Sequence, residues 1–225
     1  MSKRALFRGN LSLNVETVVT GPFQENSYII WYAGSQDAVL IDPGDDEHLI
    51  IQKLENHNLE PIAIINTHAH LDHIGAVHSL KEKYKIPFYL HEKEKFILDT
   101  YEITCRMFDI PPKETPEVNI WLKDKDKVTI NNFHFITVNT PGHTPGGTCF
   151  QIENHLFVGD TLFQGSVGRT DLPGGDWSTL ELSLIHLLNS VNHASIVHSG
   201  HGADTTIEKE LQQNPFLIPL KNRVN

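Results

Sequence analysis

The segment THAHLDH (67–73) concentrates three histidines and one aspartate within six residues. It overlaps the end of PIAIINT (61–67), a short and almost wholly apolar run that predicts a strand covered on both faces. His68 and His70 extend the end of this strand, and side chains two residues apart in an extended segment share one face. The two imidazoles can therefore bind the same metal ion.

Asp72 and His73 stand where the chain turns into an amphipathic helix predicted for residues 73–84. Adjacent side chains at such a turn point in different directions, so these two are better placed to bind a second ion or to orient the first pair. The spacing H-x-H-x-D-H after an apolar strand and before a helix thus predicts a site for two metals. The alternative is a polar strand-to-helix turn that holds histidines without a metal.

Three further metal-capable side chains follow predicted strands later in the chain, beside glycines that permit sharp loops. They are His143 in TPGHTPGG, Asp160 in FVGDTLF and His201 in IVHSGHG. Taken alone, each is more typical of a turn than of a ligand. With Asp160 between the two ions, the full set completes two groups of ligands: His68, His70 and His143, and Asp72, His73 and His201.

The composition is that of an acidic globular protein. The chain has 225 residues, of which 39% are hydrophobic and 20% charged, and its formal net charge is −10. A nucleic-acid partner is not expected, because phosphate binding requires a basic face. No apolar run approaches the roughly 20 residues that span a membrane. The N-terminus shows no secretory signal, and Cys105 and Cys149 indicate free thiols. We therefore expect a cytoplasmic monomer or homodimer without a membrane partner.

Predicted strands and helices alternate in both halves of the chain, and no linker or repeat interrupts them. Two hairpins are expected, at 127–140 with a turn at Asn131-Asn132 and at 147–160 with a turn at Glu153-Asn154. This order fits one sandwich of two sheets flanked by helices. The other predicted strands are 12–21, 26–32, 37–42, 61–67, 87–90 and 194–198, and the predicted helices are 46–57, 73–84, 91–109, 177–190 and 204–213.

The order of these motifs along the chain resembles the metallo-β-lactamase superfamily over about residues 26–201. Shorter motifs resemble the short bacterial glyoxalase II-like hydrolases within it: DPG (42–44), PGHTPG (141–146), GDTLF (159–163), GRTDLPGGD (168–176) and NPF (214–216). The resemblance implies an α/β (α+β) fold, an αββα sandwich of two mixed β-sheets flanked by helices, as a single domain over 1–225. It also implies two Zn²⁺ per chain, with Fe or Mn as alternatives.

The same resemblance implies hydrolysis of an ester, thioester or lactam. Two metals would share a water and lower its pKa toward about 7, so that a bridging hydroxide attacks the carbonyl carbon. Asp72 would orient this hydroxide, and Asp160 would bridge the metals. A thiol has a pKa of about 8.5, so it can leave as a thiolate with little need for protonation. The predicted substrate is therefore a small-molecule thioester such as S-lactoylglutathione.

Three residues near these motifs have predicted supporting roles. Asp42, at a strand end, is expected to orient a metal-bound histidine through its other ring nitrogen. The alternative for Asp42 is a turn-capping aspartate. Arg169 and Asp171 are expected to form an ion pair that fixes a loop near the metals, with a substrate contact as the alternative. Asn26 could support the site or be a polar loop residue.

The segment 91–117 is predicted either to form a lid over the site or to pack its apolar face on the sandwich. Its candidate substrate contacts are Tyr101, Arg106, Met107 and Phe108. Full-length glyoxalase II enzymes carry a helical C-terminal domain that holds glutathione, and we expect this chain to lack it. The resemblance therefore does not extend to glutathione specificity.

Other functions stay open beside the hydrolase. Persulfide dioxygenases resemble this chain and share GRTD, but they use one iron held by the counterparts of His68, His143 and Asp160. The second-metal residues present here favour the hydrolase. A weak β-lactamase or lactonase activity is compatible with the same chemistry. A metal-binding scaffold without catalysis is disfavoured by the complete ligand set.

Overall fold

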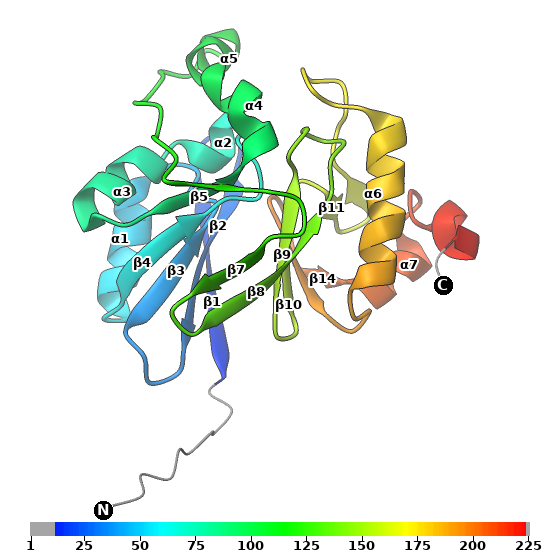
Figure 1. The fold of residues 1–225 in the computed structure, drawn as a ribbon, viewed down its shortest axis with the longest axis horizontal. Coiled ribbons are helices and arrows are strands. Elements are labelled where there is room, and N and C mark those ends of the chain that lie inside the picture. Colours follow the sequence, from blue (N-terminus) through cyan, green and yellow to red (C-terminus); the bar gives the residue numbers. More distant parts are fainter. Residues whose placement is uncertain (1–11, 224–225) are drawn as a thin grey trace, which may run out of the picture.

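The structure, a computed structural model, describes residues 12–223. Two six-stranded mixed sheets pack face to face at its centre (Figure 1). In the first sheet the strand order follows the chain, antiparallel from β1 to β3 and parallel from β3 to β6. Its strands are β1 (Leu13–Thr20), β2 (Glu25–Tyr32), β3 (Asp37–Ile41), β4 (Glu60–Ile65), β5 (Phe88–His91) and β6 (Ile120–Leu122).

The second sheet has the order β14-β13-β10-β9-β8-β7. Its pairs are antiparallel except for β10 with β13, so that β8, β10 and β13 run in the same direction. Its strands are β7 (Lys127–Ile130), β8 (Phe133–Asn139), β9 (Thr148–Ile152), β10 (His155–Gly159), β13 (Ile196–Ser199) and β14 (Thr205–Thr206). A small hairpin of β11 (Leu162–Phe163) and β12 (Ser166–Val167) follows β10.

Helices cover the outer faces of both sheets (Figure 1). On the first sheet lie α1 (Glu47–Asn56), α2 (Leu71–Ile74), α3 (Val77–Tyr84), the 3₁₀ helix η1 (Glu92–Glu94), α4 (Lys95–Asp99) and α5 (Tyr101–Met107). On the second lie α6 (Trp177–Ser190), α7 (Ile207–Gln213) and the 3₁₀ helix η2 (Ile218–Arg223). The predicted αββα sandwich is therefore confirmed. Within residues 12–223, no helix has the length and apolar character needed to cross a membrane.

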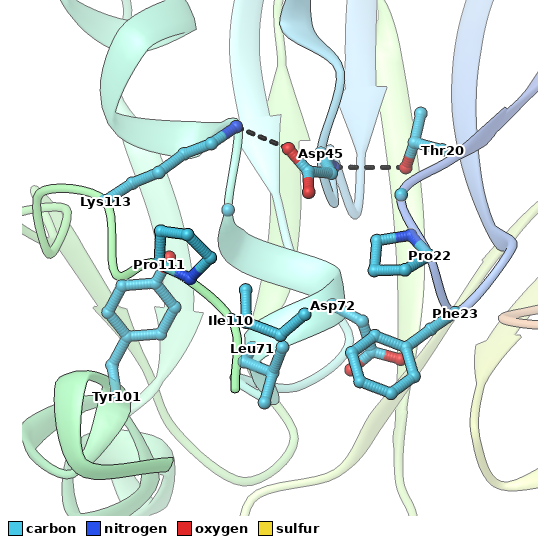
Figure 2. A pocket seen from close by; sticks show the side chains of 12 residues that line it. Thr20, Pro22, Phe23, Asp45, Leu71, Asp72, Tyr101, Ile110, Pro111 and Lys113 are labelled. Atoms are coloured by element: carbon cyan, nitrogen blue, oxygen red, sulfur yellow. Dashed lines mark hydrogen bonds and ion pairs between the residues drawn. The ribbon is translucent and has the colours of Figure 1, made fainter. Parts of the chain in front are cut away.

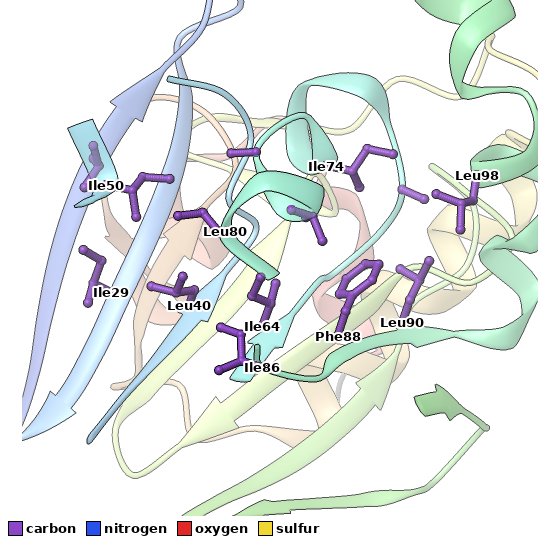
Figure 3. Packing of buried hydrophobic residues seen from close by; sticks show 14 of the residues in the cluster. Ile29, Leu40, Ile50, Ile64, Ile74, Leu80, Ile86, Phe88, Leu90 and Leu98 are labelled. Carbon is purple, nitrogen blue, oxygen red and sulfur yellow. The ribbon is translucent and has the colours of Figure 1, made fainter. Parts of the chain in front are cut away.

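Successive side chains of the first sheet pack alternately into two separate hydrophobic cores. In β3, Leu40 faces the helices and Val39 faces the other sheet, as expected for a strand whose successive side chains point to opposite faces. In β4, Ile64 and Ile65 divide in the same way. Figure 3 shows the helix-side core, where Ile64 and the other strand residues meet Leu80. This double burial explains the almost continuous apolar run at 61–67.

Most predicted elements are found, including both hairpin turns, where Asn131 and Glu153 adopt positive φ. Two predicted helices are interrupted. The helix predicted for 73–84 starts earlier, at Leu71, and breaks between α2 and α3. Gly75 lies there against the carbonyl of Gly44, which a Cβ on Gly75 would approach to 2.4 Å. The segment predicted as one helix over 91–109 contains the end of β5, then η1, α4 and α5.

We predict that Phe88→Ala destabilises the protein by about 3–5 kcal/mol, because removing a buried phenyl ring loses apolar burial and leaves a cavity. Phe88 is fully buried in the helix-side core. Urea unfolding measures the change. The control is Ile136→Ala on the second sheet, where the side chain is 61% exposed. Equal effects from the two variants would contradict this description of the core.

Candidate metal centre

The predicted ligands all follow strands at one edge of the sandwich. Because β3 and β4 are parallel, and β8, β10 and β13 also share a direction, the carboxyl ends of these strands can present residues to one edge. His68 and His70 lie between β4 and α2, and Asp72 and His73 lie in α2. The remaining three follow strands of the second sheet: His143 after β8, Asp160 after β10 and His201 after β13.

The first group of ligands is His68, His70 and His143. One ring nitrogen from each of them lies within 4.8 Å of the others. The ring centroids of His70 and His143 are 4.6 Å apart, and that of His68 lies 4.8 Å from His70 and 4.9 Å from His143. The structure therefore brings His143 to His68 and His70, which lie more than seventy residues earlier in the chain.

The second group is Asp72, His73 and His201, whose candidate ligand atoms also lie within 4.8 Å of one another. His201 Nε2 is 3.2 Å from Asp72 Oδ2. Asp72 and His73 are on adjacent positions of the single turn α2, so they approach this point from one side and His201 from the other. This group combines nitrogen and oxygen ligands.

Asp160 lies between the two groups. Its Oδ2 is 3.5 Å from His143 Nε2 of the first group and 3.6 Å from His201 Nε2 of the second. Its Oδ1 is 3.3 Å from His73 Nε2. One carboxylate thus reaches ligands of both groups, which is the geometry that a bridging ligand requires.

Four of the histidines are oriented by hydrogen bonds at Nδ1. His73 donates to Asp42 Oδ2 at 3.1 Å, His143 to the Arg169 carbonyl at 2.7 Å and His201 to the Phe23 carbonyl at 3.1 Å. His68 Nδ1 lies 3.0 Å from the hydroxyl of Thr67. Since that hydroxyl itself donates to Asp42, it can accept from His68. Each imidazole is therefore held with Nδ1 protonated and Nε2 free to bind a metal.

The free Nε2 atoms test whether the site suits a metal. The Nε2 atom of His68 is buried without a hydrogen-bond partner, an arrangement that costs free energy unless something binds there. The Nε2 atoms of His73 and His143 are also buried and face the Asp160 carboxylate, at 3.3 and 3.5 Å. Burial lowers the pKa of His70 to about 3 and that of His68 well below its usual value. Both imidazoles are therefore neutral near pH 7, the state that binds a metal. The residues present fit a metal centre.

Asp42 has the position that the sequence analysis assigned to it. Its Oδ1 accepts from the Thr67 amide at 2.6 Å, and its Oδ2 accepts from the Thr67 hydroxyl and His73. Through these bonds one carboxylate orients a histidine of each group. Asp42 also adopts φ 47°, a left-handed conformation that is strained for aspartate and that the surrounding bonds must hold. The geometry matches the orienting function better than the turn-capping alternative.

Glu94 was not identified from the sequence, yet its carboxylate joins two ligand-bearing loops. It is completely buried, and it accepts from the Ala69 amide at 2.9 Å and from the Gly146 amide at 2.6 Å. Ala69 lies between two ligands of the first group, and Gly146 lies three residues after the third. A Cβ on Gly146 would lie 2.9 Å from Glu94 Oε1, so glycine permits this contact.

Two loops around the centre are also fixed by predicted residues. Arg169 donates to Asp171 from Nε and Nη2, both at 2.7 Å, so the predicted ion pair is present, and the Arg169 carbonyl holds His143. Asn26 donates to the carbonyls of Ser199 and Gly202, both at 2.9 Å. Asn26 therefore fixes the loop that carries His201, which favours the supporting alternative.

A cavity of about 390 Å³ opens in front of the ligands. Of the candidate substrate contacts, Phe108 lines it, and Tyr101 and Arg106 do not. Figure 2 shows Tyr101 beside Ile110 and Pro111, around a smaller cavity of about 20 Å³. The Arg106 side chain is 72% exposed and faces Glu102 instead.

Comparison with known proteins agrees with this centre. A family model described as the metallo-beta-lactamase superfamily matches residues 20–201, and the chain belongs to that superfamily. A protein of Bacillus subtilis named probable metallo-hydrolase YqgX is 37% identical over 88% of this chain and 94% of its own. A protein of Haemophilus influenzae named hydroxyacylglutathione hydrolase GloC is 36% identical over 91% and 98% of the two chains.

Solved structures show the same fold. The B3 metallo-beta-lactamase BLEG-1 matches with a TM-score of 0.85 and 39% identity, over 91% of this chain and 99% of that one. TTHA1623, solved in a di-iron-bound form, matches with a TM-score of 0.83 and 38% identity, over 90% and 100%. ETHE1 from Myxococcus xanthus, with a TM-score of 0.75 and 23% identity over 92% and 89% of the two chains, shows the shared fold alone. The chain is thus a metal-dependent hydrolase by family.

We predict that Glu94→Gln weakens metal binding at the His68, His70 and His143 group by about 10- to 100-fold, as loss of a ligand-orienting bond does. The amide can accept from one backbone N–H only, and its NH₂ would face the other. Calorimetric titration of the metal-free protein with zinc measures the effect. Glu92→Gln, an exposed residue of the same helix η1, is the control. Two unchanged binding steps in Glu94→Gln would contradict the orienting function.

Proposed function

We propose that this protein hydrolyses thioesters at a centre of two metal ions. The observation that carries the proposal is the pair of adjacent ligand groups with Asp160 between them. The relative named hydroxyacylglutathione hydrolase supports a thioester as the substrate class. Water and the thioester give a carboxylate and a thiol. Because a thiol has a pKa of about 8.5, the leaving group needs little help from a protonated side chain.

The metals, when bound, supply a Lewis acid for the carbonyl and a water that is acidic enough to react near neutral pH. The chain's own residues supply the rest. His68, His70 and His143 would hold one ion, Asp72, His73 and His201 would hold the other, and Asp160 would bridge them. Asp72 also lines the cavity, and its carboxylate would accept a hydrogen bond from a water or hydroxide there. Asp42 keeps the imidazoles oriented during turnover.

Zinc is our proposal for the metal, with iron or manganese as alternatives. Imidazole and carboxylate ligands suit all three ions, so the ligand set alone does not select one. The similar protein TTHA1623 was solved in a di-iron-bound form, which supports iron as the first alternative. Metal analysis of protein purified from its native cells distinguishes these ions. We further propose that the protein acts in the cytoplasm on a small molecule, as a monomer or homodimer.

Lactam hydrolysis is a second candidate function. The structure named as a B3 metallo-beta-lactamase is 39% identical to this chain, and the same centre would polarise a lactam carbonyl. A lactam nitrogen is a poorer leaving group than a thiolate and requires a proton. We therefore propose weak lactamase activity at most. A persulfide dioxygenase remains the oxidoreductase alternative, and it would require one iron instead of two metals.

The first test is hydrolysis of S-lactoylglutathione and S-acetyl-N-acetylcysteamine by zinc-loaded protein. Release of free thiol measures the rate. The same sample stripped by a chelator is the control. We expect turnover that disappears on stripping and returns with zinc. A protein with two bound metals that hydrolyses neither thioester would show the thioesterase proposal to be wrong. Iron-loaded protein would then be assayed with persulfides for oxygen consumption.

We predict that Asp72→Ala removes one of the two metals and most hydrolysis while the fold persists, because the second ligand group loses its carboxylate and the first keeps its three imidazoles. Elemental analysis gives the metal content, and circular dichroism checks the fold. Asp99→Ala is the matched control, since Asp99 lies at the surface and pairs with Lys95. An Asp72→Ala protein with two metals and full activity would overturn the two-metal assignment.

Asp160→Ala is expected to lower the occupancy of both metals, because Asp160 Oδ2 approaches His143 and His201 almost equally. The measurement is again metal content per chain, after dialysis against a fixed free zinc concentration. Loss of a single metal would assign Asp160 to one group only. Wild-type occupancy of both would show that it is no ligand.

A further inference from the structure

The cavity beside the ligands is walled mainly by apolar side chains. Its volume of about 390 Å³ lies within the range of small-molecule sites. The inner wall holds residues of both ligand groups and Asp160, and Arg169 and Thr104 also contribute. The apolar walls come from the β1–β2 turn, the start of α2, the end of α5, the β11–β12 hairpin and the loop after it: Phe23, Leu71, Phe108, Phe163, Val167 and Leu172. Substrate atoms next to the scissile bond would therefore lie against hydrocarbon.

Two of these aromatic side chains pack against each other in the cavity wall. Phe23, in the turn between β1 and β2, and Phe108, just after α5, pack edge to face with ring centroids 5.9 Å apart. They remain 37% and 40% exposed. Phe163 lies beside the candidate ligands, with its ring centroid 6.0 Å from that of His201. Exposed aromatic surface in a concave site gains free energy when an apolar ligand group covers it.

Away from the metal ligands, the described side chains of the cavity wall offer no unpaired positive charge to an anionic tail. Among the cavity-lining residues within 12–223, Arg169 is the one permanently cationic side chain. Its guanidinium is already bound by both oxygens of Asp171, at 2.7 Å each. The protein as a whole carries a formal net charge of −10. The two carboxylates of glutathione would thus find no free cation on these walls.

From these walls we infer that the site selects thioesters with an apolar acyl group, such as an arylacetyl group, and makes little use of a charged thiol carrier. The inference rests on the proposed thioesterase function and adds the substrate class. The apolar acyl group would lie against the surface formed by Phe108, Phe23 and Leu172, and the thiol carrier would point toward solvent. A small hydroxyacyl group such as lactoyl leaves these walls uncovered.

Three thioesters distinguish the effect of the acyl group on kcat/KM from the effect of the thiol carrier. They are S-lactoylglutathione, the lactoyl thioester of N-acetylcysteamine, and the phenylacetyl thioester of N-acetylcysteamine. With the zinc-loaded protein we expect the phenylacetyl compound to exceed the lactoyl compound on the same carrier by roughly tenfold or more in kcat/KM, as for extra groups in a hydrophobic pocket. The two lactoyl compounds should differ by less than about threefold. A tenfold advantage for the glutathione carrier would overturn the inference.

Phe108→Ala tests the wall directly. Truncation should lower the ratio of phenylacetyl to lactoyl kcat/KM by roughly tenfold. The reason is that, of the two substrates, only the phenylacetyl compound would have an apolar acyl group that contacts the lost ring. Ile103→Ala is the matched control, since Ile103 is on α5, is 61% exposed and does not line the cavity. The control should keep the wild-type ratio. An unchanged ratio in Phe108→Ala, with wild-type metal content, would overturn the inference.

Binding without turnover separates this inference from the proposed function. Calorimetry on the zinc-loaded protein compares two thioethers that cannot be hydrolysed, S-phenethyl-N-acetylcysteamine and S-methylglutathione. If no thioester is turned over but the phenethyl thioether binds more tightly and Phe108→Ala removes that advantage, the thioesterase proposal fails and the apolar selectivity holds. If thioesters are turned over but S-methylglutathione binds as tightly as the phenethyl thioether, the selectivity fails and the thioesterase proposal holds.

Discussion

The centre depends on one constraint, that each imidazole facing it must satisfy its N–H elsewhere. Each of four histidines does so at Nδ1 with a fixed acceptor: Asp42 for His73, Thr67 for His68, and the backbone carbonyls of Arg169 and Phe23 for His143 and His201. Once Nδ1 is committed, the lone pair of Nε2 faces the centre. These acceptors belong to loops of both sheets. The positions of the ligands are therefore set by how the two sheets pack together at this edge.

Much of the fold follows from local sequence patterns. The apolar run at 61–67 predicts a strand covered on both faces, and the turns at Asn131 and Glu153 fall where the hairpins require them. The predicted helix at 73–84 fails at Gly75, where the carbonyl of Gly44 lies too close for a side chain. That contact joins segments about thirty residues apart in the sequence. Helix propensity and hydrophobic periodicity depend on residues near one another in the sequence, so they cannot predict it.

The candidate metal ligands could be proposed from the sequence because their types and spacing suit a metal, and the structure brings all seven side chains to one edge of the sandwich. The residues that support them carry weaker signals. Glu94 shares helical spacing with the buried Ile97, Leu98 and Tyr101, so an acid stands on an apolar face, and that was the available clue. Its partners, the amides of Ala69 and Gly146, come from other loops, and no local pattern records them.

The walls of the cavity were the hardest to predict, for the same reason. Phe23, Phe108 and Phe163 come from three separate segments, and of these only Phe108 was named as a candidate contact from the sequence. Yet the metal centre by itself suits any carbonyl that water can attack, so it cannot choose among thioesters, lactones and lactams. Discrimination must come from groups that contact the rest of the substrate. In this chain the candidate ligands are therefore signalled by residue type and spacing, four of the seven lying within residues 68–73, while the walls that would set selectivity come from residues that meet only in the folded protein.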